Sequence, residues 1–170
     1  TIAPFLKFEE DPYPVIDSSG KLWWLLDAYT ISDQFPYSTK THRGYNYIRN
    51  SVKIAVNAYD GNVTFYAIDP SDTLLQMYQR AFPSLFSNAI NLEDDLRNHL
   101  RYPVGLFSAQ AQMFLRYHVT EPQTFFTQSE QWNIPLETRI GKAGVQVNPS
   151  YLVMRLPGEA KEEFVLLLPF

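Results

Sequence analysis

The apolar positions in the first part of the chain are spaced as in β-strands. Residues 13–17 and 22–29 are two apolar runs on either side of a Ser-Ser-Gly turn at positions 18–20. Such runs around a turn signal are typical of a hairpin. Residues 32–45 follow as a long polar and aromatic stretch that a proline and a glycine interrupt. Loops of this length are uncommon and often functional, so this stretch is a candidate functional loop.

A second hairpin is predicted around Asp60-Gly61, which lies between residues 52–58 and 63–68. Asp-Gly between strand-like runs favours a tight turn because that turn needs positive φ. Along the first run, apolar residues alternate with polar ones such as Lys53. We therefore expect one buried face and one face in water, with Lys53 on the side in water.

Helices are predicted in the middle of the chain, where apolar residues recur at helical spacing. The first covers residues 74–82, with Asp69-Pro70 as its cap and Pro83 as its end. A second begins at Asn91 and carries three acidic residues in its first turn, which the helix dipole favours. A third covers residues 104–118.

The last part of the chain returns to strand-like runs. Residues 120–123 and 127–130 match the capping-box pattern, so two short helical turns are expected. Residues 142–149 are expected to form a loop, and residues 151–156 and 163–168 a final hairpin. The order of strands, helices and strands predicts an α+β fold, with an antiparallel sheet built from hairpins and a helical middle segment packed on one face.

Composition excludes several classes of protein. Aromatic residues make up 15% of the 170 residues, which excludes a disordered chain. A net charge of −4 excludes a broad basic surface, so we expect no nucleic-acid partner. Cys is absent, which excludes disulfides and thiolate catalysis. We expect a single soluble domain over residues 1–170, and the apolar run near the C-terminus suggests a fragment of a larger protein.

Catalytic and metal-binding patterns are weak. The three His residues lack the spacing of a zincin helix, and neither a nucleophile elbow nor a glycine-rich phosphate loop is present. Asp17, Asp27 and Asp33 lie near expected strand ends, where a glycosidase would place paired carboxylates, but eighteen acidic residues always provide some such pair. We therefore expect no cofactor, no metal site and no assigned catalytic residue.

A candidate interaction surface is centred on the long loop. Tyrosines and arginines beside adaptable amides suit recognition. The alternative, which we favour, is structural: buried rings and hydroxyl hydrogen bonds hold the loop on the sheet. His42 and Asn50 extend the cluster. The candidate residues are Tyr29, Asp33, Tyr37, Arg43, Tyr45, Asn46, Tyr47 and Arg49.

A candidate anion site lies on the predicted second and third helices. It consists of Arg97, His99, Arg101 and Arg116. The alternative is structural, because basic residues late in a helix complement its dipole. They can also pair with the acidic first turn, where Glu93 lies four residues before Arg97.

Six segments in one order carry a family resemblance. The segments are 27–33 (Asp-Ala-Tyr-Thr-Ile-Ser-Asp), 46–53 (Asn-Tyr-Ile-Arg-Asn-Ser-Val-Lys), 58–61 (Ala-Tyr-Asp-Gly), 82–86 (Phe-Pro-Ser-Leu-Phe), 100–103 (Leu-Arg-Tyr-Pro) and 154–159 (Met-Arg-Leu-Pro-Gly-Glu). With these segments the chain closely resembles the central part of a bacterial family catalogued as uncharacterised protein family 0182, while residues 139–148 match no motif of it.

The resemblance implies a location more than an activity. Members of this family look like multipass bacterial membrane proteins with a large extracytoplasmic region. The chain is therefore expected to be an extracytoplasmic binding or assembly domain. Its expected partner is the rest of its own membrane-anchored chain, and another envelope protein is a second candidate partner. One alternative is an envelope hydrolase that acts on glycan or lipid, with Asp27, Asp33 or His99 in a cleft. Another is a protease-binding module, because residues 52–69 are similar to PepSY-type modules.

Overall fold

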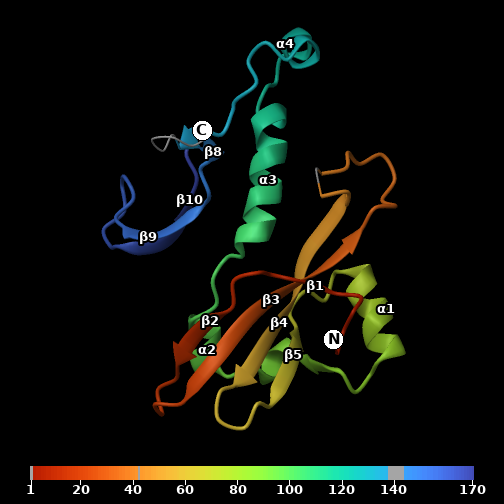
Figure 1. Cartoon of the computed structure of the whole chain (residues 1–170), viewed down its shortest axis with the longest axis vertical. Helices are drawn as coiled ribbons and strands as arrows, with labels where there is room; N and C mark the ends of the chain where they lie inside the picture. Colours follow the sequence, from red (N-terminus) through yellow and green to blue (C-terminus); the bar gives the residue numbers. More distant parts are fainter. Residues whose placement is uncertain (1, 42, 138–143) are drawn as a thin grey trace. The chain divides into compact units, whose positions relative to one another are not determined.

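Two compact units make up the chain, Thr1–Leu106 and Phe107–Phe170. The structure is a computed structural model that describes residues 2–41, 43–137 and 144–170 (Figure 1). Each unit is described by itself below. The chain divides into two compact units, and whether they form the single domain predicted over residues 1–170 stays a prediction.

A six-stranded sheet forms the first unit. Its strands are paired in the order β1-β3-β4-β5-β6, and β2 also pairs with β3 (Figure 1). The pairings are antiparallel except between β5 and β6, which run parallel. The strands are β1 (Lys7–Phe8), β2 (Tyr13–Ile16), β3 (Leu22–Ser32), β4 (Tyr47–Asn57), β5 (Val63–Ala67) and β6 (Phe86–Asn88).

Both predicted hairpins in this unit are confirmed. β2 pairs with β3, and β4 pairs with β5 across a turn in which Gly61 has a φ of 71°. A side chain rarely adopts such a φ, which is why the turn needs glycine. β3 and β4 also pair with each other along most of their length, so the long loop joins two central strands. A register shift follows Ala28 and marks a bulge.

Helices cover both faces of the sheet. α1 (Thr73–Ala81) contributes Leu75 to a core with even-numbered residues of β3 and β4, such as Ala28 and Val52. α2 (Asp94–Asn98) and a preceding short 3₁₀ turn, η1 (Ala89–Asn91), cover the opposite face, where Leu96 and Leu25 belong to a second core. The α+β class is confirmed. The helical middle segment is divided between two faces because residues of both parities along β3 and β4 are buried.

Lys53 is the clearest correction that follows from this arrangement. The face predicted to lie in water is covered, and Lys53 is buried with only 6% of its surface exposed. Its neighbours Ser51 and Ala55 on β4 are buried as well. A polar residue in an alternating strand therefore lies inside the fold, where it needs a partner.

The cap of α1 also differs from the prediction. Asp72 is the N-cap residue, and its carboxylate accepts a hydrogen bond from the Leu74 N–H. Asp69 instead accepts hydrogen bonds from Ser71 and pairs with Arg49. The helix ends at Ala81, before Pro83, as predicted.

The second unit contains most of α3 (Val104–Tyr117) and the short α4 (Pro122–Thr127). Glu121 caps α4, whereas the second predicted helical turn, at residues 127–130, does not form: Thr127 ends α4 and residues 128–130 are a turn, with Gln128 at a left-handed φ of 55°. Part of the predicted loop at 142–149 pairs as a strand, while its first two residues lie outside the described residues. The strands are β7 (Leu136–Glu137), β8 (Val145–Gln146), β9 (Ser150–Met154) and β10 (Glu163–Leu167).

Aromatic contacts hold part of this unit together. The Phe114 ring lies 5.7 Å from Trp132 and 6.0 Å from Phe170, and His118 stacks on Trp132 at 4.0 Å. The predicted final hairpin is confirmed as β9 and β10, with the Tyr151 and Phe164 rings stacked at 5.1 Å.

A candidate functional site: a buried polar row

Three charged side chains lie side by side across the central sheet of the first unit. Asp27 on β3 is directly opposite Lys53 on β4. On the other side of β3, Glu9 follows β1, and its N–H donates a hydrogen bond to the Asp27 carbonyl at 2.9 Å. The Glu9 carboxylate just after β1, the Asp27 carboxylate on β3 and the Lys53 ammonium group on β4 therefore lie next to one another across the sheet. We call Glu9, Asp27 and Lys53 the polar row.

Asp27 and Lys53 form a buried ion pair. Their side chains are 3% and 7% exposed, and the Lys53 Nζ donates to the Asp27 Oδ1. The Asn50 Nδ2 donates to the same oxygen at 2.9 Å, and the Lys53 Nζ also donates to the Arg101 carbonyl at 3.1 Å. These added bonds matter because burying a charge is costly unless it is paired and hydrogen-bonded.

Glu9 holds the other end of the row. Its Oε2 accepts hydrogen bonds from the Tyr29 hydroxyl and, at 2.8 Å, from the Gly105 N–H. A Cβ on Gly105 would lie 2.8 Å from the Glu9 Oε2 and 3.0 Å from the Tyr29 hydroxyl. Glycine allows this close approach, because real Cβ atoms essentially never come within 3.0 Å of another atom, so a side chain at position 105 would displace the Glu9 carboxylate.

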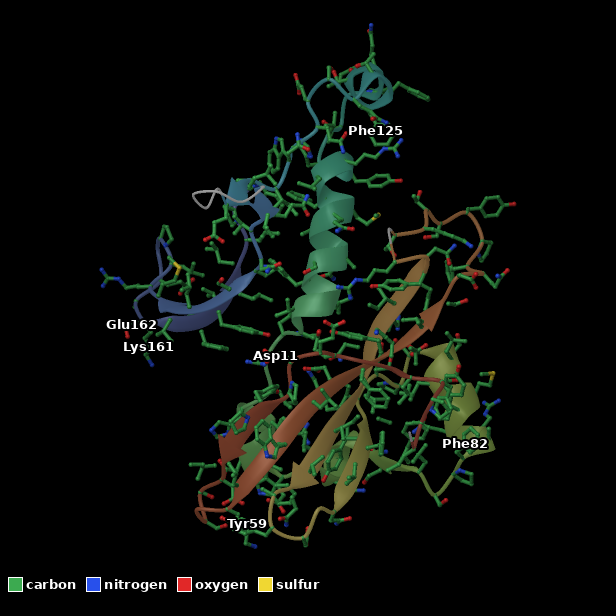
Figure 2. All side chains as sticks on the ribbon, in the orientation of Figure 1. Asp11, Tyr59, Phe82, Phe125, Lys161 and Glu162 are labelled. Carbon is green, nitrogen blue, oxygen red and sulfur yellow. The ribbon has the colours of Figure 1, made fainter. Side chains whose placement is uncertain are left out.

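The segment from Arg101 to Gly105 is bound to the row at both ends, through the Arg101 carbonyl and the Gly105 N–H. The Arg101 side chain leads away from the row, to the Asp11 carboxylate at 2.7 Å, and its guanidinium lies 3.8 Å from the centre of the Tyr13 ring. Figure 2 shows Asp11 near the start of the strand that carries Tyr13. The row is therefore closed off by backbone as well as by side chains.

Burial and hydrogen bonding act in opposite directions on the two carboxyl groups. Burial raises the pKa of Asp27, and the nearby Glu9 charge adds to this effect, although Lys53 and Asn50 oppose it. Burial also acts to raise the pKa of Glu9, but hydrogen bonds from Tyr29 and from two backbone N–H groups outweigh it and hold the pKa below its usual value. The row thus contains one carboxyl group kept ionised and one driven toward its neutral form.

A second polar network lies at the start of α1. The Asp72 carboxylate is fully buried and accepts hydrogen bonds from Thr30, Ser51 and Tyr47. Burial and the Asp72 charge raise the pKa of Tyr47 to about 12. All three donors lie on β3 and β4, so this network attaches α1 to the sheet.

The structure places the residues of the candidate interaction surface in three different environments. Asp33, Tyr37 and Arg43 are exposed on the loop, and Tyr37 has a left-handed φ of 58°. Asn46 and Tyr47 contact the loop itself. The Asn46 Nδ2 donates hydrogen bonds to the carbonyls of Phe35 and Ser38, and the Tyr47 ring stacks on the Phe35 ring. Tyr29, Tyr45 and Arg49 hold the fold together, and His42 lies outside the described residues. Recognition by the three exposed residues stays a prediction.

The candidate anion site is divided among separate local contacts. Arg97 donates to the carbonyls of Ala89 and Leu92 and pairs with Asp94 at 3.6 Å, so its acidic partner is Asp94 and not the predicted Glu93. The His99 Nδ1 contacts the Asp95 carbonyl. Arg101 pairs with Asp11, and Arg116 in the second unit lies 5.2 Å from the Phe125 ring centre.

Within the described residues, the predicted candidates for an enzyme site lie in separate contacts. Asp27, Asp33 and His99 have separate partners, namely Lys53, Lys40 and Asp95. Asp17 caps a turn through Ser19 and Lys21. In the same residues, no group of three or more His, Cys, Asp or Glu side chains is placed to hold a metal ion.

Glu9, Lys53 and Gly105 were missed by sequence reasoning. The sequence did contain a signal for a buried Asp27–Lys53 pair. The two residues carry opposite charges, and each lies within an apolar run that is expected to form a strand. Glu9 and Gly105 gave no such signal, because they are 96 residues apart and meet only through the tertiary fold.

Comparison with other proteins shows the family of the chain. The model of the Uncharacterised protein family (UPF0182) matches residues 1–170. The chain belongs to this family. A UPF0182 protein of Sulfurovum sp. (strain NBC37-1) is 47% identical over 174 residues, covering 99% of this chain and 19% of that protein. A UPF0182 protein of Microcystis aeruginosa is 49% identical over 174 residues, covering 100% of this chain and 18% of that protein.

The UPF0182 chain therefore spans about a fifth of the length of the curated relatives it matches. A UPF0182 protein of Methanospirillum hungatei shows the same proportion, at 47% identity and 19% coverage. No solved structure matches the chain. Among the helices of the described part, none has both the length and the apolar character needed to cross a bilayer.

Proposed function

We propose that this UPF0182 region is a binding or assembly module in the extracytoplasmic part of a multipass membrane protein. The family resemblance supports the location. The length of the relatives supports an assembly role, because about four fifths of each relative lies outside the matched region. A module of this kind needs a surface that the remaining polypeptide covers.

The β9–β10 ribbon is the observation that carries the proposal. Val153 and Phe164 are paired on one face and are 67% and 59% exposed, while Leu152 and Leu167 on the other face are 45% and 41% exposed. An isolated two-stranded ribbon is marginally stable in water, and monomers rarely expose large apolar patches. The ribbon therefore has the properties of an element that packs against further protein.

The proposed occupant is another part of the same longer polypeptide. A covalently connected segment is present at high effective concentration, so a modest apolar contact is enough to keep it bound. Lys161 and Glu162 lie in the connection between β9 and β10 (Figure 2). These charged residues offer an exposed control position next to the apolar ribbon.

Site-specific thiol labelling of a full-length UPF0182 protein tests this packing. The region contains no Cys, so Val153→Cys introduces the single thiol of this region, and any Cys elsewhere in the full-length protein is first replaced by Ser. We expect the Val153→Cys thiol to be protected in the native protein and labelled after denaturation. The matched control Lys161→Cys should label in both states. Equal labelling rates at the two positions would refute the packing proposal.

The location is tested with the same control variant. A membrane-impermeant thiol reagent applied to intact cells should label Lys161→Cys, and the full-length protein should fractionate with membranes. Recovery of the full-length protein in the cytosolic fraction would contradict the proposed location.

A further inference from the structure

The polar row brings together the groups needed for a covalent link between strands. A primary amine on β4 contacts a carboxyl group on β3, both are almost fully buried, and a second carboxyl group lies on the other side of β3. An amine and a carboxylic acid in contact, with water excluded, can condense to an amide. Contact replaces a bimolecular encounter with an intramolecular one, which lowers the entropic part of the barrier.

We propose that the Lys53 Nζ and the Asp27 Cγ form an intramolecular isopeptide bond that joins β3 to β4. The proposal depends on the register of the two strands, because Asp27 and Lys53 are directly opposite each other. It goes beyond the assembly role and does not depend on it.

The reaction balances without a further reactant. A proton first moves from the Lys53 ammonium to the Asp27 carboxylate, which leaves a neutral amine and a neutral acid. The amine lone pair attacks the Cγ, the Cγ–Nζ bond forms, and the Cγ–Oδ2 bond breaks. The Oδ2 leaves as water with the acid proton and one proton from the nitrogen. The Oδ1 remains as the amide oxygen.

Neighbouring side chains favour each step. The Asn50 Nδ2 donates to the Oδ1 at 2.9 Å, so it can stabilise the negative charge that this oxygen gains during the attack. The Glu9 charge opposes ionisation of Asp27, which favours the neutral acid that condensation requires. Condensation also removes two buried charges, whose desolvation is costly.

Tryptic digestion of the denatured full-length protein provides the test. Without the bond, trypsin cuts after Lys21, Lys40, Arg49 and Lys53, so peptides 22–40 and 50–53 are released separately. With the bond, Lys53 is not a cleavage site. Peptide 22–40 should then appear joined to peptide 50–80, at the sum of their masses less one water.

Two variants control the assignment. Lys53→Arg preserves the charge but cannot form this bond, so peptide 22–40 should be free. Lys21→Arg changes an exposed lysine and leaves the cleavage pattern intact, so the joined peptides should remain. Glu9→Gln should lower the joined fraction at neutral pH.

The wild-type digest decides the proposal even where Lys53→Arg fails to fold. Joined peptides in most wild-type molecules, sequenced by fragmentation to Asp27 and Lys53, would establish the bond. Free peptides 22–40 and 50–53 in a wild-type sample of the folded protein would overturn it.

Discussion

At the scale of single residues, the first unit buries charged side chains beside hydrogen-bond partners. Asp72 has no exposed surface, and Lys53 and Asp27 have almost none. Each has a partner on a neighbouring element, because an unpaired buried charge costs several kcal/mol, about 3–5 when one partner of a buried pair is removed. The same residue types on the surface would contribute little.

Asp72 predicts a specific dependence of stability on pH. Burial acts to raise its pKa, but hydrogen-bond donors outweigh burial and hold the pKa below its usual 3.8. Since the pKa of Asp72 is lower in the folded than in the unfolded protein, the stabilisation is present above pH 4 or so and is lost as the pH falls through the folded value. The donors are Ser51, Thr30, Tyr47 and the Leu74 N–H.

Urea unfolding between pH 3 and pH 7 measures this effect. The free energy of unfolding of the wild-type protein should decrease toward pH 3, and Asp72→Asn should be less stable at pH 7 with a shallower decrease. An Asp60→Asn variant, which changes an exposed turn carboxylate, serves as the control. A slope unchanged by Asp72→Asn would exclude the role given to this network.

At the scale of elements, the segment before and at the start of α3 is attached to the sheet by close polar contacts. Gly105 lies in the first turn of α3 and donates to Glu9. The contact explains how a loop from the end of α2 can lie over the sheet without a large apolar side chain. It also predicts which substitution the contact cannot tolerate.

Gly105→Ala should destabilise the protein. At an open helical position this change is favourable by about 1 kcal/mol, because alanine is the better helix former. Here the added Cβ meets Glu9 and Tyr29 within 3.0 Å, and overpacking of this kind costs about 1–3 kcal/mol. Chemical denaturation should show a net loss of stability. In a Glu9→Ala background the loss should shrink, and a stabilised Gly105→Ala protein would argue against the close contact.

At the scale of the whole molecule, the first unit contains a sheet with a hydrophobic core on each face. Its two faces carry separate cores, one with Leu75 of α1 and one with Leu96 of α2. The second unit is instead held together by aromatic contacts around Trp132, and its β9–β10 ribbon exposes apolar side chains. Independent stability is therefore expected of the first unit.

A chain that ends at Leu106 should fold alone. We expect its far-UV circular dichroism to show mixed helix and strand, and its urea unfolding to be a single cooperative transition, because both sheet faces are covered within it. A chain from Phe107 to Phe170, made in parallel, should lack a cooperative transition. A first unit without cooperative unfolding would show that its core is incomplete.

Local pattern alone was enough for the hairpins and most helices. The turn at Gly61, the third helix and the β9–β10 hairpin were predicted because turn chemistry and apolar periodicity act within a few residues. The cap of α1 was misassigned to Asp69 because two aspartates stand within one turn of the helix start. Only Asp72 has buried hydroxyl donors opposite it.

The sequence by itself determined the α+β class, the membership of UPF0182 and the absence of cysteine chemistry, since these follow from local patterns and composition. Only the tertiary structure decided that Lys53 is buried and that Glu9, Asp27 and Lys53 form one row. A strand's pattern shows that its two faces differ but not whether both are covered. That depends on α1 and α2 packing on opposite sides of the same sheet, through contacts between residues far apart in the chain.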